Sequence, residues 1–176
     1  MISSKITIVE ATDNVFACLA GEATQDSEYS ELKLAPSGLI DQSDECSGDI
    51  GYLRRITASI REIIDPCAWI AIKDHEVVGI LLYAAPPTAH NEIILTGCVA
   101  PDHQNIGHGI RLYQRGIDII EATTSFSGLI VQIYDRNKRS QRVHRFLGFR
   151  PYETGYDNEL GDFTWYRRAL KSAEGR

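Results

Sequence analysis

Residues 99–109 read VAPDHQNIGHG and join an apolar run to a stretch with helical periodicity. The run Glu92–Val99 predicts a strand, and from Gly107 to about Thr123 the apolar side chains fall on one helical face. At the start of a helix several backbone N–H groups lack partners, and the helix dipole adds partial positive charge. The stretch therefore predicts an anion-binding turn, in which Gly107 and Gly109 let a phosphate approach the main chain.

A Gly-x-Gly turn by itself is also typical of a tight connection into a helix, so the surrounding letters decide. Here the turn is Gln104-x-x-Gly107-x-Gly109, and Val99-x-Pro101 precedes it. This pattern resembles the acetyl-CoA loop of the GNAT superfamily of N-acetyltransferases. The resemblance, like the residues, places a diphosphate at the start of the helix.

A second match follows about 30 residues further on, in the order that the family has. Asn137-x-x-Ser140, then His144, then Gly148-Phe149 resemble the second cofactor motif, which is usually Asn-x-x-Ala, Tyr and Gly-Phe. The resemblance covers roughly residues 66–170. A dinucleotide-binding domain is the competing interpretation of the glycines, but there the Gly-x-Gly would follow the first strand rather than the third main strand.

The expected fold is α/β (α+β), a single domain over residues 1–176. The resemblance implies a mixed, mostly antiparallel sheet of about six or seven strands with a splayed parallel pair, flanked by about four helices. It also implies that residues 1–65 shape the acceptor site and residues 66–170 form the cofactor-binding core. Periodicity and turn residues predict strands over Lys5–Val9, Ala68–Lys73, Val77–Ala84, Glu92–Val99, Gly128–Tyr134 and Phe163–Leu170, and helices over Val15–Gly21, Tyr52–Ile64, Gly107–Thr123 and Lys138–Leu147.

The resemblance implies acetyl-CoA as the acetyl donor and no metal. The family's cofactor-binding positions correspond to Cys98, Val99, Gln104, Asn105, Ile106, Gly107, His108, Gly109, Ile110, Asn137 and Ser140. Family members usually carry a basic residue inside the phosphate loop, where this chain has Asn105 and Ile106. Recognition of the diphosphate is therefore expected to depend more heavily on backbone amides.

Two residues are the candidates for proton transfer. His144 stands where the family commonly has the Tyr that protonates the departing thiolate, and an imidazole can do the same chemistry. Glu92, at the start of the central strand, is the candidate general base for the amine. The alternatives are a purely structural His144 and an exposed strand-start acid at Glu92.

Charge is distributed unevenly along the chain. The formal net charge is −6, and residues 22–49 hold eight acids against Lys33 alone, so the rest of the chain is about neutral. We therefore expect no nucleic-acid partner, and we expect a small cationic amine or an antibiotic-like compound as acceptor if the acidic segment lines its pocket. The alternative is that the segment is simply a soluble loop.

Further predictions concern location and partners. No apolar run approaches a membrane span and no secretory signal is visible, so we expect a cytoplasmic protein with no membrane partner. The family often dimerises, and Trp165 and Tyr166 offer apolar area for a homodimer. The alternative functions are a catalytically silent acyl-CoA-binding regulatory module and a protein or peptide N-acetyltransferase.

Overall fold

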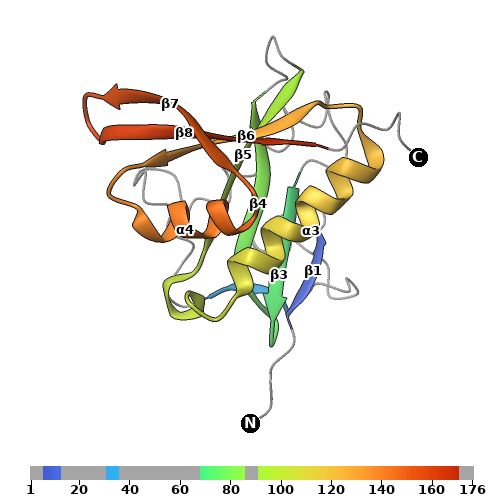
Figure 1. Cartoon of the computed structure of the whole chain (residues 1–176). Coiled ribbons are helices and arrows are strands. Elements are labelled where there is room, and N and C mark those ends of the chain that lie inside the picture. The colour runs from blue at the N-terminus through green and yellow to red at the C-terminus, as the bar shows by residue number, and fades with distance from the viewer. Residues whose placement is uncertain (1–5, 13–30, 36–67, 86–90, 171–176) are drawn as a thin grey trace. The chain divides into compact units, whose positions relative to one another are not determined.

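The computed structural model describes residues 6–12, 31–35, 68–85 and 91–170 (Figure 1). These residues fall into two compact units. Of the described residues, the first unit contains 6–12, 31–35, 68–82 and 97–113, and the second contains 83–85, 91–96 and 114–170. The helices expected over 15–21 and 52–64 lie outside the described residues.

The strands of the first unit follow the order β1-β3-β4-β5, and β2 pairs with β4. β1 runs antiparallel to β3, and β3 runs antiparallel to β4, whereas the short β2 is parallel to β4. The bounds are β1 (Thr7–Glu10), β2 (Lys33–Leu34), β3 (Ala68–Lys73), β4 (Glu76–Ala85) and β5 (Glu92–Val99), of which β4 and β5 also reach into the second unit.

The β3–β4 hairpin is the expected one, and its strands are buried because their sequence is almost continuously apolar. Its two-residue turn, Asp74 and His75, has φ values of 50° and 65°, the left-handed geometry whose twist suits a two-residue hairpin. Trp69, Ile70 and Leu81 are each at most 2% exposed. Removing these side chains from water is the main favourable term that holds this unit together.

In the second unit the strands follow the order β5-β6-β8-β7. β5 and β6 are parallel, and the pairs β6–β8 and β7–β8 are antiparallel. Figure 1 shows β7 and β8 as the red hairpin near the C-terminal end of the chain. The bounds are β6 (Gly128–Tyr134), β7 (Arg150–Asp157) and β8 (Gly161–Ala169).

The parallel pairing of β5 with β6 is short. It joins Glu92 to Gly128, Ile93 to Leu129 and Ile94 to Ile130, and the register ends there. The mixed, mostly antiparallel sheet with a parallel pair is thus confirmed. β7 was not predicted, because Pro151 and Gly155 interrupt its pattern and its residues are mostly exposed, as an edge strand allows.

Two of the four expected helices are present in the described part of the chain, together with one 3-10 turn. They are α3 (His108–Thr123), α4 (Lys138–Phe146) and the turn η1 (Pro101–His103). The expectation of about four helices is therefore corrected to two for these residues. Neither helix is long and apolar enough to cross a membrane.

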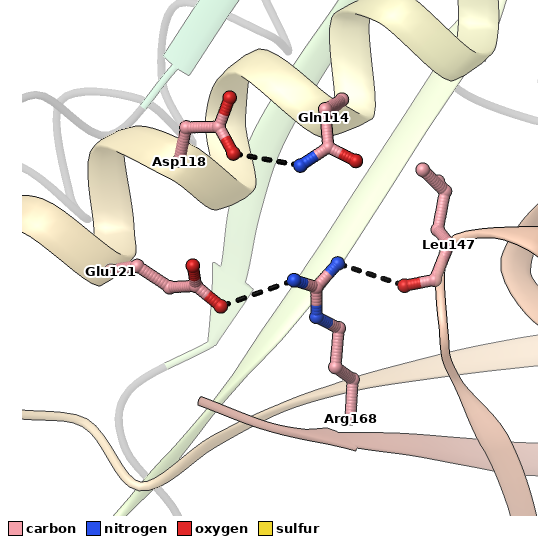
Figure 2. A network of polar contacts seen from close by, with 5 residues as sticks. All are labelled: Gln114, Asp118, Glu121, Leu147 and Arg168. Carbon is pink, nitrogen blue, oxygen red and sulfur yellow. Dashed lines mark hydrogen bonds and ion pairs between the residues drawn. The ribbon is translucent and has the colours of Figure 1, made fainter. Parts of the chain in front are cut away.

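Buried ion pairing joins three elements of the second unit (Figure 2). The guanidinium of Arg168, on β8, binds the Glu121 carboxylate of α3 at 3.1 Å and donates to the Leu147 carbonyl at 2.8 Å. The Arg168 and Glu121 side chains are only 19% and 13% exposed. One side chain therefore neutralises a carboxylate and satisfies a carbonyl at the end of α4.

Candidate functional site

The turn between β5 and α3 is held in shape by its own polar groups. The Gln104 side chain donates from Nε2 to the Val99 carbonyl at 2.8 Å, tying the loop to the end of the strand. The backbone N–H of His103 donates to Ala100 O at 2.8 Å, and that of Gln104 donates to Pro101 O at 3.2 Å. Gln104 therefore positions the loop from within.

Two residues of the turn have left-handed backbone geometry. Asn105 has φ 66° and Gly107 has φ 86°. Asn tolerates this region better than other residues with a Cβ, and glycine adopts it without strain. A Cβ built on Gly107 would meet nothing within 4 Å, so its Cα borders open space from which a ligand can reach the main chain. Ile106, between them, is 57% exposed and blocks no approach.

Helix α3 begins directly after this turn. Its first hydrogen bond runs from the Arg111 N–H to the Gly107 carbonyl at 3.1 Å. The N–H groups of His108, Gly109 and Ile110 precede that bond and so have no acceptor within the helix. Helix α3 has no acidic residue in its first turn. The predicted residues from Gln104 to Ile110 therefore lie together at the start of α3, where three main-chain N–H groups lack an acceptor within the helix and the helix dipole favours negative charge.

The end of β5 is packed tightly against β4, and this packing fixes the start of the loop. A Cβ on Gly97 would lie 2.8 Å from the Ile80 carbonyl oxygen, so only glycine fits. Tyr113 of α3 donates its hydroxyl to Gly97 O at 3.4 Å, and the Ala100 N–H donates to Val78 O at 2.9 Å. The group that approaches Gly97 most closely is therefore the backbone of β4.

Two histidines stand at the ends of the loop. The rings of His103 and His108 stack with centroids 6.0 Å apart and planes at 20°. His108 is buried, and burial is the main cause that lowers its pKa below the usual value. Repulsion from His103, Lys73 and Arg111 lowers the pKa of His108 further. At neutral pH His108 is therefore an uncharged ring in a positive environment.

Glu92 lies in the second unit, at the opposite end of β5 from Val99. It is not an exposed strand-start acid, because its side chain is 7% exposed and binds Arg167 Nε at 2.7 Å. The guanidinium of Arg167 also lies over the Tyr152 ring, 4.3 Å from its centroid. A Cβ on Gly128 would approach Glu92 Oε1 to 2.8 Å, so the pairing strand leaves room for this carboxylate. Its role as base stays a prediction.

His144 lies on α4 in the second unit and is 3% exposed. Its Nδ1 lies 2.8 Å from the Ser140 carbonyl oxygen, which can only accept, so Nδ1 carries the hydrogen of the neutral ring. Burial lowers the pKa of His144 to about 4, with the Ser140 contact opposing that shift. The neutral ring therefore presents Nε2 as an acceptor, and it must gain a proton before it can act as an acid.

The second motif caps both ends of α4. Asn137 is the N-cap, and its Oδ1 accepts the Ser140 N–H at 3.0 Å. At the other end Gly148 has φ 89°, its N–H donates to Arg145 O, and the Phe149 N–H donates to His144 O. These two bonds form a Schellman motif, and the His144 and Phe149 rings make its edge-to-face contact at 5.3 Å.

The predicted residues thus form two groups. Cys98, Val99 and the loop through Ile110 belong to the first unit, and Glu92, Asn137, Ser140 and His144 belong to the second. Within the second group, Glu92 binds β8 while His144 contacts α4 and Phe149.

Sequence reasoning missed Lys73 and Arg111 as charges beside the loop, because only the β3–β4 pairing and the first turn of α3 bring them there. No group of three His, Cys, Asp or Glu residues that could hold a metal occurs in the described ranges.

Comparison with known proteins now identifies the family. Residues 39–149 match the model of the Acetyltransferase (GNAT) family, which is more than half of the chain. The chain belongs to the GNAT acetyltransferase family. The turn before α3 and the α4 caps are therefore elements of a GNAT acetyltransferase, an enzyme of the acyltransferase class. No curated protein matches the sequence.

Solved GNAT structures share the fold at low sequence identity. The yncA protein of Salmonella typhimurium, solved with its cofactor acetyl-CoA, is 18% identical with TM-score 0.68, covering 94% of each chain. Phosphinothricin acetyltransferase of Sinorhizobium meliloti, in complex with acetyl-CoA, is 16% identical with TM-score 0.67, covering 97% of this chain and 94% of that one. A chimera of Vibrio cholerae spermidine N-acetyltransferase with hSSAT is 12% identical with TM-score 0.63, covering 94% and 96%.

Proposed function

We propose that this protein is an acetyl-CoA-dependent N-acetyltransferase that acts on a small cationic amine. The observation that carries the proposal is the turn before α3, where the N–H groups of His108, Gly109 and Ile110 precede the first helical bond. The residues fit a diphosphate, because Gly107 borders open space and the first turn of α3 has no acid to repel it. Two structurally similar GNAT proteins were solved with acetyl-CoA.

Acetyl-CoA supplies the activated thioester, and the chain orients it for direct attack by a neutral amine. The loop amides bind the diphosphate, while the main chain of Cys98 and Val99 lines the path of the pantetheine arm. Asn137 and Ser140 belong to the proposed cofactor site through their place at the start of α4. In this proposal the whole chain is one catalytic domain, with residues 1–65 shaping the acceptor site and residues 66–170 forming the cofactor-binding core.

Proton transfer is assigned to Glu92 and His144. The amine loses one proton and the departing sulfur gains one, so the two groups must together move a proton from nitrogen to sulfur. His144, neutral with its hydrogen on Nδ1, would take a proton at Nε2 before giving it to sulfur. Glu92 is already engaged with Arg167, so as a base it acts from within an ion pair or through water.

The acceptor assignment depends on charge. Most of the acidic segment 22–49, including Asp41, Asp44, Glu45 and Asp49, lies outside the described residues. Its net charge of −7, from eight acids and one base, favours a cationic acceptor. The spermidine N-acetyltransferase chimera is a structural neighbour that bears a polyamine in its name. A cytoplasmic location and a homodimer complete the proposal.

Calorimetric titration with acetyl-CoA, followed by thiol release in the presence of an amine panel, tests this function. The panel contains spermidine, a neutral hydroxylamine ether, an amino-acid amide and a peptide with a free N-terminus. We expect saturable binding and faster thiol release with the cationic amine. Binding without turnover on any amine would instead favour the silent acyl-CoA-binding module, for which the uncharged His144 is the structural argument. No saturable binding would overturn the proposal.

Glu92→Gln separates a catalytic from a structural carboxylate. A general base lost in this way lowers kcat by about 10²–10⁴-fold while acetyl-CoA affinity stays constant. An ion-pair role lowers thermal stability and leaves kcat within a few-fold. Glu153→Gln, which removes an exposed carboxylate from β7, is the matched control and should change neither quantity.

A further inference from the structure

The loop proposed to bind the diphosphate has no basic residue inside it, yet it is bracketed by two imidazoles. Asn105 and Ile106 occupy its centre, His103 ends η1 and His108 begins α3. The two rings stack with centroids 6.0 Å apart. The ring of His108 and one of the loop amides belong to the same residue.

Both rings hold a buried polar atom. Nδ1 of His103 and Nδ1 of His108 are buried and have no hydrogen-bond partner among the described residues. His108 is 5% exposed, so water reaches its ring poorly. A buried polar atom without a partner is unfavourable, and such atoms gather where a ligand or proton completes the site.

The charged groups that act on His108 come from three elements and have one sign. They are Lys73 at the end of β3, Arg111 in the first turn of α3 and, when protonated, the ring of His103 at the end of η1. Burial first, and then these positive charges, lower the pKa of His108 and so favour its neutral ring. The helix N-terminus adds positive potential of its own. This environment lacks the negative charge that an anion would bring.

We infer that His103 and His108 form a proton-linked half of the anion site: when the diphosphate occupies the loop amides, the stacked pair takes up a proton from solvent. The resulting imidazolium supplies the charge that Asn105 and Ile106 do not. This inference rests on the proposed function and adds two side chains to its binding site. An opposite charge within about 4–6 Å of a histidine shifts its pKa by about 1–3 units toward the protonated form.

The direction of the pH effect follows from linkage. The bound state holds more protons than the free state, so affinity rises as pH falls between about 7.5 and 6. Uptake of a whole proton gives about tenfold tighter binding per pH unit, and uptake of half a proton gives about threefold. His144 is neutral throughout this range, because its pKa is about 4.

Calorimetry at pH 6.5 with 3′-dephospho acetyl-CoA measures the proton directly. This analogue lacks the phosphate monoester, which itself titrates near pH 6, so any proton exchanged belongs to the protein. Titrations in two buffers of different ionisation enthalpy give the number of protons taken up. We expect about 0.3–1 proton per ligand. Saturable binding with no proton taken up would overturn the inference and leave the proposed function standing.

Variants assign the proton to the pair. His103→Asn and His108→Asn should each reduce the uptake by at least about half and flatten the pH dependence of affinity, because each removes one ring of the pair. His75→Asn, in the exposed β3–β4 turn and paired with Glu31, is the control and should keep the wild-type uptake.

If His108→Asn does not fold, a second measurement on the wild type replaces it. The imidazole proton signals are followed over a pH titration with and without the ligand. Two results would contradict the inference. One is a proton uptake that stays unchanged in the variants that fold, and the other is a pH titration of the His103 and His108 signals that the ligand does not shift. Failure of acetyl-CoA itself to bind would overturn the proposed function and this inference together.

Discussion

The loop before α3 differs from the Arg168 junction, formed by Arg168, Glu121 and Leu147, in whether its charges are neutralised within the protein. In the loop, the main-chain donors at His108, Gly109 and Ile110 face no acid of the first helical turn, and in the proposed function the diphosphate supplies the negative charge. At the junction, Arg168 is already matched by Glu121 and the Leu147 carbonyl. An unmatched site is available for binding, whereas a matched one serves stability, so substitutions in the two regions should change different measurements.

Breaking the junction should give the largest effect. Arg168→Ala leaves Glu121 mostly buried without its cation and the Leu147 carbonyl without a donor. We expect a loss of roughly 3–4 kcal/mol in the free energy of unfolding, the lower part of the range for buried pairs because Arg168 is partly exposed. Urea denaturation measures it. Acetyl-CoA affinity of the folded fraction should stay within about twofold.

Arg115→Ala, an exposed arginine on the outer face of α3, is the control for losing one positive charge. It should change stability by less than about 0.5 kcal/mol. An Arg168→Ala protein as stable as the Arg115→Ala protein would show that the junction does not contribute to stability as described.

His144 sharpens the comparison because it is a buried titratable side chain, 3% exposed, whose neutral form is favoured by burial. Its pKa falls from the ordinary 6.5 to about 4 on folding, so the unfolded chain binds the proton more readily. The part of the free energy of unfolding that depends on the neutral His144 ring is fully present above about pH 6.5. It is lost as pH falls toward 4, by about 3 kcal/mol in total. Denaturation of the wild type and of His144→Gln from pH 7 to 4 isolates this contribution, since the carboxylates are common to both. Parallel pH profiles would contradict it.

Two glycines with similar backbone geometry provide a controlled test of the proposed diphosphate site before α3. Gly107 has φ 86° and Gly161 has φ 87°, and a Cβ on either meets nothing within 4 Å. Alanine at either position should therefore lower stability by a similar amount, about 1 kcal/mol. Only Gly107→Ala should weaken acetyl-CoA binding, by about 100-fold or 2.8 kcal/mol, because its methyl group enters the space before the loop amides. Equal affinities of the two variants would argue against the loop as the binding site.

Many of the strands and helices, and the loop before α3, were predictable from sequence, because glycine turns and hydrophobic periodicity are both local signals. The strand Glu92–Val99, the strand Gly128–Tyr134 and the helix after Gly107 were predicted almost to the residue. β7 was missed because its pairing with β8, rather than its own pattern, makes it a strand. The loop was found from its letters, whereas the Lys73 and Arg111 charges beside His108 depend on tertiary packing.

Sequence also indicated the residues of the second motif without showing what they do locally. Asn137 and Ser140 were expected as cofactor contacts, and the structure adds that one caps the N–H of the other. Glu92 was recognised as a carboxylate at a strand start, but its partner Arg167 lies 75 residues away on β8. Ion pairs between distant segments follow from the register of the sheet, which no single-sequence pattern specifies.

The smallest expected effect is at that cap. Asn137→Ala removes the acceptor for the Ser140 N–H and should lower the free energy of unfolding by about 1 kcal/mol. Asn137→Asp keeps a capping oxygen and should restore stability. If Asn137 also contributes to the cofactor site, the added carboxylate weakens acetyl-CoA binding although stability recovers. Restored stability with unchanged affinity would limit Asn137 to capping.

Amide chemical shifts under titration with acetyl-CoA test the central claim most directly. The account predicts that the backbone N–H signals of Gly107, His108, Gly109 and Ile110 move together and saturate with the binding curve, while the Asp74–His75 turn and Gly161 stay in place. Saturable binding that leaves those four amides unmoved would contradict it.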